Sequence, residues 1–398
     1  MKIVSVVGAR PNFMKVAPLC RALKAYPQVE HVLVHTGQHY DVRMSEQFFK
    51  ELDIPNPDIN LGIGSGSHAE QVGKTMIAFE KVVREEKPDW VVVLGDVNAT
   101  IACSITAKKE HVKCAHVEAG LRSRDMDMPE EINRLVTDRL SDLLFTPDRL
   151  SDANLRAEGV PEERIKFVGN IMIDTLERER EKASALDLNE IVKDNAIGDD
   201  GNPNAEKQRG EEVALKDKSC AVLKDREYVA MTMHRPSNVD QRETLVPAMR
   251  FFLDEVVKDY PIVWAIHPRA QKMLKEFGLW EEVVSNPNMI LVNPLGYHAM
   301  LRLNMGAKLF MTDSGGLQEE CCVLGTPCLT MRWNTERPIT LAEHGGASRL
   351  VGNDVGKIRA AYHEALSTDR SHPVLNSGTA TRPSASRRFW PLDGRRGI

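Results

Sequence analysis

The stretch that most clearly marks this chain as an α/β protein reads Thr312-Asp-Ser-Gly-Gly-Leu-Gln-Glu-Glu320. The apolar run Lys308-Leu-Phe-Met311 before it predicts a buried strand, and Leu317 to Leu324 predicts a helix that ends at Gly325. A strand, a Ser-Gly-Gly turn and a helix start present backbone N–H groups to an anion. Such turns are common, so this stretch taken alone is better explained as a tight turn with a capping serine.

In the anion-binding interpretation, Gly315 and Gly316 leave room for a phosphate, because a Cβ at either position would collide with it. Glu320, just inside the helix, could then accept hydrogen bonds from neighbouring sugar hydroxyls. The two interpretations are separated by what the rest of the chain places near this turn.

Length and composition limit the classes of protein to consider. A chain of 398 residues can form two α/β domains with separate cores. A net charge of −5 without a Lys/Arg block argues against a nucleic-acid partner. No apolar run approaches the roughly 18 residues of a membrane span, and the apolar N-terminus is too short for a signal peptide. The cysteines are odd in number without zinc-type spacing, which predicts buried reduced thiols in a cytoplasmic protein and no metal.

Strands alternate with helices at βαβ spacing along most of the chain, which predicts parallel sheets covered on both faces. We therefore expect two doubly wound, Rossmann-like domains that face each other across a cleft. The expected parts are an N-terminal domain (1–170), a connecting helix (171–185), a polar surface insertion with a helical turn or two and few core contacts (186–219), a C-terminal domain (220–367) and an atypical tail (368–398).

Polar residues follow several predicted strands at their carboxyl ends, where ligands bind in such sheets. They are Arg10, His39, Asp96 and Glu118. One polar residue at a strand end is usually a cap, but several, including two acids, favour a site.

Glu130 opens a helix and is expected at the same edge, whereas the helix dipole suffices to explain Glu131. Three neighbouring carboxylates suit proton removal from carbon or protonation of a leaving group. The cations Arg10, Lys15 and Arg134 would balance the carboxylates and pair with a phosphate.

His234 ends a strand of the second half, before Arg235-Pro236. A lone histidine there is more often structural, but opposite a phosphate turn and three acids it favours a phosphate-neutralising or acid role. No H-x-x-E-H motif indicates a metal, and no G-x-G-x-x-G follows the first strand, so a dinucleotide cofactor is not expected.

Together these motifs resemble, in their order, those of the non-hydrolysing UDP-N-acetylglucosamine 2-epimerases, from Met1 to about Ala365. They are Gly8-Ala-Arg-Pro11, Thr36-Gly-Gln-His39, Gly95-Asp96, His116-Val-Glu-Ala-Gly-Leu-Arg122, Pro129-Glu-Glu-Ile-Asn-Arg134, His234-Arg235, His267-Pro268, Thr312 to Glu320 and Thr335-Glu-Arg-Pro338.

The resemblance implies a glycosyltransferase-B type fold, a homodimer, no cofactor and a UDP-sugar substrate. It implies reversible inversion at C2 of UDP-N-acetylglucosamine through elimination of UDP to a 2-acetamidoglucal and its re-addition. The implied catalytic set is Asp96, Glu118, Glu130 and His234. The implied substrate-binding set is Arg10, Lys15, Arg134, Ser314, Gly315, Gly316, Glu320 and Arg337, with the Ser-Gly-Gly turn on the phosphates and Glu320 on the ribose.

Three alternatives stay open: another sugar nucleotide, another enzyme class and a binder without activity. The Gln38-His-Tyr-Asp-Val-Arg-Met-Ser-Glu-Gln47 stretch also occurs in relatives that act on diacetamido-uronic acid nucleotides, whereas Thr335-Glu-Arg-Pro338 favours UDP-N-acetylglucosamine. Family members that are activated by a second molecule of UDP-N-acetylglucosamine have a glutamine-arginine-rich stretch where this chain has Gln38 to Gln47. The resemblance therefore does not extend to that activation. A glycosyltransferase of the same fold is the rival enzyme, and a silent UDP-sugar binder the third class.

The tail departs from the family, whose members end in Trp-Asp-Gly and an Ala-rich helix that crosses back to the N-terminal domain. Residues 377–394 show no helical period and contain two prolines. If the gene is read in the frame that starts at the last base of codon 377, suitable codons encode Trp-Asp-Gly-Asn-Ala-Ala-Glu-Arg-Ile-Ala-Ala-Ile-Leu-Ala-Ala-Gly-Arg. The Leu-Ala pair in that sequence, which comes from the codons of Phe389-Trp-Pro391, arises whichever synonymous codons are used.

We hypothesise that a one-base insertion or deletion near Leu375–Ser377 replaced the terminal helix, and we expect lower stability and activity than in an intact relative. The nucleotide sequence around codon 377 tests this. A shifted frame that does not encode the helix would end the hypothesis.

Overall fold

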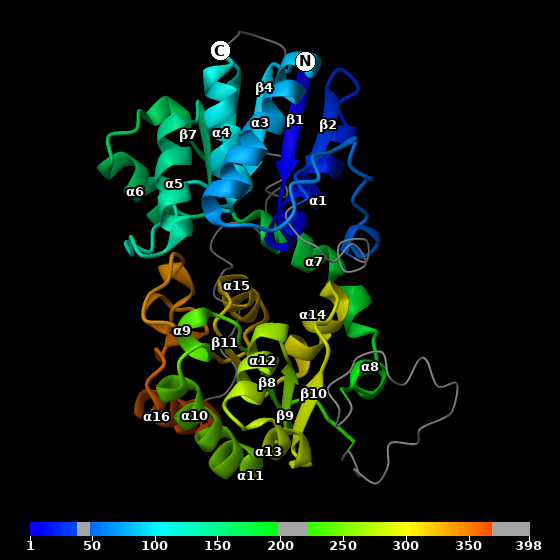
Figure 1. Ribbon diagram of the computed structural model, residues 1–398, viewed down its shortest axis with the longest axis vertical. Coiled ribbons are helices and arrows are strands. Elements are labelled where there is room, and N and C mark those ends of the chain that lie inside the picture. The colour runs from blue at the N-terminus through cyan, green and yellow to red at the C-terminus, as the bar shows by residue number, and fades with distance from the viewer. Residues whose placement is uncertain (38–47, 198–221, 368–398) are drawn as a thin grey trace. The chain divides into compact units, whose positions relative to one another are not determined.

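The computed structural model describes residues 1–37, 48–197 and 222–367, so residues 368–398, where the altered tail is expected, lie outside the described part. The chain divides into two compact units, Met1–Glu179 and a second unit that begins at Arg180. In the described residues each unit contains one sheet whose named strands all pair in parallel (Figure 1). The expected doubly wound α/β architecture is therefore confirmed, while the cleft between the two domains and their predicted limits stay predictions.

In unit 1 the strand order is β3-β2-β1-β4-β5-β6-β7. Because the order reverses beside β1, the loops after β1 and β4 diverge at that point, as in other doubly wound sheets. The strands are β1 (Lys2–Val7), β2 (Glu30–His35), β3 (Ile59–Asn60), β4 (Trp90–Leu94), β5 (Lys113–Val117), β6 (Leu143–Thr146) and β7 (Ile165–Phe167). The helices are α1 (Arg10–Lys24), α3 (His68–Glu86), α4 (Asn98–Lys109), α5 (Pro129–Leu140), α6 (Arg149–Ala157) and α7 (Ile171–Ser184).

The sheet of unit 1 is buried on both faces, which explains why its central strands are almost continuously apolar. Val4 and Val6 pack with Phe79 of α3 and Cys103 of α4 in one core cluster. In Figure 1, α3, α4 and α5 lie next to one another on one face of this sheet. On α7, Thr175 donates its hydroxyl to the Met14 carbonyl of α1 at 2.6 Å, which ties the end of the unit to its first helix.

In unit 2 the strand order is β10-β9-β8-β11-β12-β13, so β8 and β11 are neighbours at the reversal point. The strands are β8 (Val229–Thr232), β9 (Ile262–Ala265), β10 (Met289–Val292), β11 (Leu309–Thr312), β12 (Cys328–Thr330) and β13 (Ser348–Leu350). The helices are α8 (Leu188–Asn195), α9 (Pro236–Val239), α10 (Arg242–Phe251), α11 (Val257–Asp259), α12 (Pro268–Glu276), α13 (Trp280–Ser285), α14 (Tyr297–Gly306), α15 (Gly315–Leu324) and α16 (Val355–Ser367).

Alternate residues of these strands fill two separate cores, one on each face of the sheet. Met231, Trp264 and Met311 belong to the core on one face. Phe310 belongs to the core on the other face, where it packs with Cys321 of α15. The strand before the Ser-Gly-Gly turn is thus held from both sides, which fixes the position of the turn.

The expected polar insertion, 186–219, is wrong in its first part, because residues 188–197 are built into unit 2. Asp187 caps α8 by accepting the N–H groups of Asn189 and Glu190 at 2.7 and 3.1 Å. Leu188, Ile191 and Val192 are buried in the core of unit 2, and the chain then pairs with Val292 of β10 through Ala196. A helical turn or two was expected here, but the burial of its apolar residues was not, because polar residues dominate the composition of the segment. Residues 198–221 lie outside the described part.

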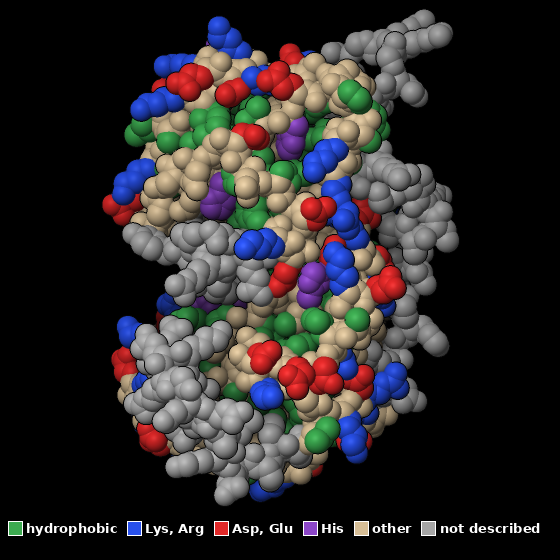
Figure 2. All heavy atoms as spheres, turned by 90° about the vertical axis from the view of Figure 1, so that its right-hand side faces the viewer, with side chains coloured by type: hydrophobic (Ala, Val, Ile, Leu, Met, Phe, Trp, Pro, Cys, Tyr) green, Lys and Arg blue, Asp and Glu red, His purple; other side chains and the backbone are tan. Residues whose placement is uncertain are grey.

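On the face that Figure 2 shows, the Lys and Arg side chains of the described residues are interspersed with Asp and Glu. None of the helices in the described part of the chain combines the length and apolar character needed to cross a membrane. The six cysteines in that part are free and buried, as expected for structural thiols.

The burial of α8 leads to a prediction about stability. We expect Ile191→Ala to lower the free energy of unfolding by about 3 kcal/mol, because it removes methyl and methylene groups from a packed core. Lys193→Ala, on the exposed side of the same helix, is the matched control and should change it by less than about 0.5 kcal/mol. Urea unfolding measures both, and equal effects would mean that α8 contributes nothing to the core.

Candidate active site

Two acids of unit 1 lie at neighbouring strand ends, as predicted. Asp96 follows β4 and Glu118 follows β5, and these strands pair in register through Leu94 and Val117. Glu118 also lies beside Gly95, because a Cβ built on that glycine would be 3.3 Å from the Glu118 carboxylate. The two carboxylates therefore leave the same edge of the sheet from adjacent loops.

Glu118 is held in a backbone conformation that few side chains adopt, with φ at +73°. The N–H groups of Glu118 and Ala119 both donate to the Phe145 carbonyl at 3.0 Å, which stabilises this turn. Its carboxylate forms an ion pair with Lys15 of α1, and both side chains are only 3% exposed. Since such a buried pair needs geometric support, the strained turn indicates that the carboxylate's position matters.

Gly95 makes this arrangement possible. Its φ is +63°, and a Cβ there would lie 2.7 Å from the Lys15 Nζ atom. Any side chain at position 95 would therefore strain the backbone and push Lys15 away from Glu118.

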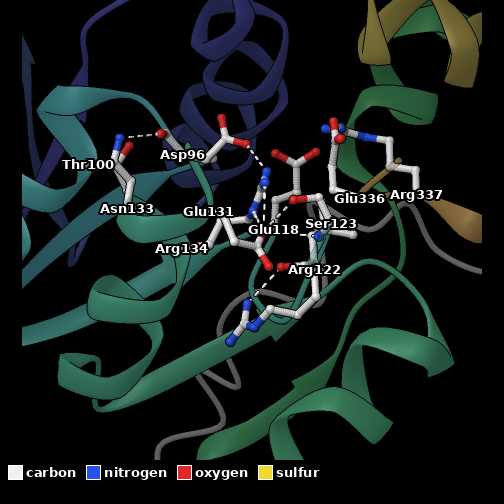
Figure 3. Close-up of polar contacts among 12 residues, drawn as sticks. Asp96, Thr100, Glu118, Arg122, Ser123, Glu131, Asn133, Arg134, Glu336 and Arg337 are labelled. Carbon is white, nitrogen blue, oxygen red and sulfur yellow. Dashed lines mark hydrogen bonds and ion pairs between the residues drawn. The ribbon is translucent and has the colours of Figure 1, made fainter. Parts of the chain in front are cut away.

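Arg134 of α5 holds the Asp96 carboxylate. Its Nη1 atom lies 2.5 Å from Asp96 Oδ2 and its Nη2 atom 2.8 Å from Glu131 Oε2, so the guanidinium joins two acids (Figure 3). Asn133 donates its side-chain amide to the Asp96 carbonyl at 2.8 Å. Asp96 is thus fixed through both its side chain and its backbone by one helix.

Glu131 does more than interact with the helix dipole, which was the explanation expected from the sequence. Its buried carboxylate accepts the N–H groups of Ser123 and Arg124 at 3.0 and 2.9 Å. Burial alone would raise the pKa of Glu131, but these hydrogen bonds and Arg134 together lower it. Glu131 therefore anchors the loop after Glu118. No sequence pattern could indicate this, because the donors are backbone N–H groups, which are the same for nearly every residue type.

Glu130, one residue earlier, has the opposite environment. It is half-buried in the first turn of α5 and makes no hydrogen bond or ion pair within the described part of the chain. Of the predicted cations, Lys15 and Arg134 contact the acids, whereas the side chain of Arg10 lies outside the described part and only its backbone, at the start of α1, is placed.

In unit 2, His234 follows β8 and is oriented by Asp313, which follows β11. The His234 Nδ1 atom lies 2.8 Å from Asp313 Oδ1. The second oxygen of Asp313 accepts the N–H groups of His234 and Arg235 at 2.9 and 2.8 Å. This leaves the partly exposed ring with Nδ1 engaged, so Nε2 is the nitrogen available to a ligand.

Asp313 is the functional candidate that the sequence analysis missed. Burial by itself would raise its pKa, but the hydrogen bond and charge of His234, with the backbone N–H groups, lower it to about 2. Because Thr312 pairs with Thr232 across β11 and β8, the residues that follow these two threonines start from neighbouring strand ends. The proximity of Asp313 to His234 follows once β8 and β11 are known to pair. The sequence contains no direct sign of that pairing.

The Ser-Gly-Gly turn begins α15 as predicted, with Gly325 ending the helix at φ +70°. Ser314 is the residue before the helix, but its side chain makes no capping hydrogen bond. A Cβ on Gly315 would lie 2.6 Å from Glu336 Oε1 and 3.0 Å from Arg337 Nη1. The collision that requires a glycine at 315 is thus already present within the chain, whereas Gly316 is half-exposed.

A buried cluster of charges surrounds Gly315. The Glu336 carboxylate lies between Arg332, whose Nη2 atom is 2.7 Å away, and Arg337, as Figure 3 shows for the second pair. Arg337 also pairs through Nε with Glu319 of α15 at 2.8 Å. The cluster neutralises itself and fixes the loop that carries Arg337 against the start of the helix.

Glu320 is buried in the middle of α15 and makes no hydrogen bond in the described residues. Burial, and then the neighbouring charge of Glu319, raise its pKa to about 8. A neutral carboxyl group at pH 7 can both donate and accept hydrogen bonds, which suits vicinal hydroxyls. No cluster of three or more His, Cys, Asp or Glu side chains in the described residues could hold a metal ion.

Known proteins resemble this chain over nearly its whole length. A family model described as UDP-N-acetylglucosamine 2-epimerase matches residues 21–389. A UDP-N-acetylglucosamine 2-epimerase of Methanocaldococcus jannaschii is 40% identical over 385 residues, 96% of this chain and 97% of that protein. A UDP-2,3-diacetamido-2,3-dideoxy-D-glucuronate 2-epimerase of Pseudomonas aeruginosa is 36% identical over 337 residues, 84% of each.

A solved structure agrees with the fold. It is the crystal structure of the Methanocaldococcus jannaschii UDP-GlcNAc 2-epimerase in complex with UDP-GlcNAc and UDP, which matches with a TM-score of 0.82 at 38% identity and covers 98% of both chains. The sheet topology and this structural match therefore confirm the predicted glycosyltransferase-B type architecture.

The lowered pKa of Asp313 predicts a pH dependence. Ionised Asp313 should stabilise the fold by about 2 kcal/mol, since its pKa is about 2 in the folded chain against 3.8 in an ordinary aspartate. This contribution is complete above about pH 4 and lost as the pH falls towards 2. We therefore expect the difference in unfolding free energy between the wild type and Asp313→Asn to shrink below about pH 4.

Urea unfolding from pH 6 to pH 3 measures this difference. Asp254→Asn, at an exposed position of the same unit, is the control and should show no such trend. A difference between wild type and Asp313→Asn that stays constant over the range would contradict the stabilising role of the charge.

Proposed function

The chain belongs to the UDP-N-acetylglucosamine 2-epimerase family, and on that basis we propose that it interconverts UDP-N-acetylglucosamine and UDP-N-acetylmannosamine by inversion at C2. The observation that carries the proposal is the placement of Asp96 and Glu118 on adjacent strand ends, each paired with a cation of its own unit. A glycosyltransferase of the same fold has less use for such a set of acids.

In the proposed reaction a carboxylate removes the proton from C2 while the bond from C1 to the diphosphate oxygen breaks. The C2–H electron pair forms the C1–C2 double bond of 2-acetamidoglucal, and UDP leaves with the electrons of the C1–O bond. A proton then returns to C2 on the opposite face, and UDP re-adds at C1. The sum is inversion at C2 with no oxidant, cofactor or metal consumed.

Three acids of unit 1 are proposed to handle these protons and that of the C3 hydroxyl. They are Asp96, Glu118 and Glu130, which differ in their surroundings. Asp96 and Glu118 are paired with Arg134 and Lys15, so their positions are fixed before a substrate arrives. Glu130 has no partner in the described residues and is free to reorient towards a substrate. Lys15 and Arg134 would also pair with the substrate's negative charge.

The nucleotide is assigned to unit 2. The N–H groups at the start of α15, with Ser314, Gly315 and Gly316, would bind the phosphates, and Glu320 the ribose. His234, oriented by Asp313, and Arg10 would stabilise the departing diphosphate through charge-assisted hydrogen bonds. Arg337 is proposed to shape the sugar end of this site, since its charge is engaged by Glu319 and Glu336.

The diacetamido-uronate nucleotide is the alternative substrate, because a relative with that activity is 36% identical. Thr335-Glu-Arg-Pro338 favours the N-acetylglucosamine nucleotide. Homodimeric assembly, a cytoplasmic location and the absence of a nucleic-acid or membrane partner stay predictions.

Incubation with UDP-N-acetylglucosamine in D2O tests the function. We expect deuterium at C2 and UDP-N-acetylmannosamine, both followed by NMR, because a returned proton must come from the solvent. Hydrolysis alone, or no exchange with either candidate nucleotide, would contradict the proposal.

In the same assay Asp96→Asn, Glu118→Gln and Glu130→Gln should each reduce turnover by at least about a hundredfold, the usual loss on removing acid–base assistance. Affinity for UDP should change little, because UDP is assigned to the other unit. Glu163→Gln, at an exposed glutamate of unit 1, is the matched control and should keep normal turnover. Near-normal rates in all three variants would show that the acids are structural.

A further inference from the structure

A buried histidine–aspartate pair behind the acid-bearing loops has no part in the proposed function. His116 belongs to β5 and Asp138 to α5. Their side chains are 0% and 1% exposed, and His116 Nδ1 lies 2.6 Å from Asp138 Oδ1. Since a buried polar pair needs complete hydrogen bonding, the partners of each atom determine where the protons are.

Both ring nitrogens of His116 face acceptors. Nε2 lies 2.8 Å from the Gly95 carbonyl oxygen, which has no proton to donate, so Nε2 must carry a hydrogen. Nδ1 faces the Asp138 carboxylate, which only accepts when it is ionised. With Asp138 ionised, both nitrogens therefore donate and the ring is an imidazolium cation.

The surroundings of Asp138 favour its ionised form. Its second oxygen accepts the Gly120 N–H at 3.0 Å and lies 2.7 Å from Arg122 Nη1, and both of these groups are donors. Arg122 also pairs with Glu158 through two nitrogens, each at 2.7 Å. On the far side of Gly95 lie Lys15 and Glu118, which pair with each other.

The pair connects the two loops that carry the acids. Through His116 it holds the carbonyl of Gly95, the residue before Asp96. Through Asp138 it holds the amide of Gly120, two residues after Glu118. Both glycines have positive φ, and a Cβ on Gly120 would lie 2.6 Å from the Ser151 carbonyl oxygen, so a side chain at either position would strain its loop.

We propose that His116 is held as a buried imidazolium whose two N–H groups, together with the Asp138 carboxylate, set the positions of the Asp96 and Glu118 loops relative to each other. His116 and Asp138 are positioning residues: neither is assigned a contact with the substrate. The kinetic part of this inference rests on the proposed function, whereas the protonation of His116 does not.

The protonation is tested by NMR of the protein labelled with 15N-histidine at neutral pH. We expect one histidine with protons on both ring nitrogens and slow exchange with water, because the ring is fully buried. His116→Gln should remove that signal. If this variant does not fold, Asp138→Asn identifies the signal, because it replaces the charged partner of Nδ1. A neutral His116 with one unprotonated nitrogen in the wild type would overturn the proposal.

The positioning role is tested by the kinetics of Asp138→Asn. We expect kcat to fall about a hundredfold, the scale of a displacement near 1 Å of reacting groups, with KM for the UDP-sugar changed less than about threefold. Asp152→Asn replaces an equally buried aspartate of unit 1, which pairs with Arg149, and should lower stability without this loss of kcat.

The kinetic outcomes test the positioning role independently of the proposed function. A kcat within about twofold of wild type in Asp138→Asn, or an equal loss in Asp152→Asn, would overturn the positioning role. A wild-type protein that epimerises neither candidate nucleotide would refute the proposed function instead, and the NMR result would still decide the state of His116.

Discussion

The buried ion pair between Lys15 and Glu118 is the interaction on which the geometry of unit 1 depends. Two charges with 3% exposure have lost nearly all their hydration, and removal of one partner from such a pair typically costs about 3–5 kcal/mol. The pair joins α1 to the end of β5, and it requires a glycine at 95 and a left-handed turn at 118. These constraints make the edge of the sheet rigid where the acids lie, which is the condition for placing them to within a fraction of an ångström.

In unit 2 a single buried aspartate, Asp313, holds the loops at the end of the sheet. Asp313 has no exposure, and its two oxygens are used by a histidine ring, two backbone N–H groups and the Asn238 amide. The same carboxylate therefore orients His234 and fixes the loop after β8 against the start of the turn that leads to α15. In both units a buried carboxylate organises the loops, Glu118 in unit 1 and Asp313 in unit 2.

The failures of the sequence analysis have physical causes. The insertion was judged by its Gly/Asp/Asn composition, but three apolar residues at helical spacing, Leu188, Ile191 and Val192, suffice to dock α8 on the sheet. The sequence analysis explained Gly315 by room for a phosphate and did not foresee that Glu336 and Arg337 already occupy the space that a Cβ would need. Those residues lie about twenty positions further along, so local sequence could not indicate the contact. The short edge strand β13 was not predicted, because three residues carry too little periodicity.

The sequence by itself determined the central strands, the alternation with helices and the residues that stand at strand ends, since burial on both faces imposes apolar runs and loops carry the polar groups. It also identified Asp96, Glu118 and His234 as site candidates. Only the tertiary structure decided which partner holds each of them: Arg134 for Asp96, Lys15 for Glu118 and Asp313 for His234. Ion pairs and hydrogen bonds between distant residues depend on strand order and on the path of the backbone, and these follow from packing of the whole chain rather than from any local pattern.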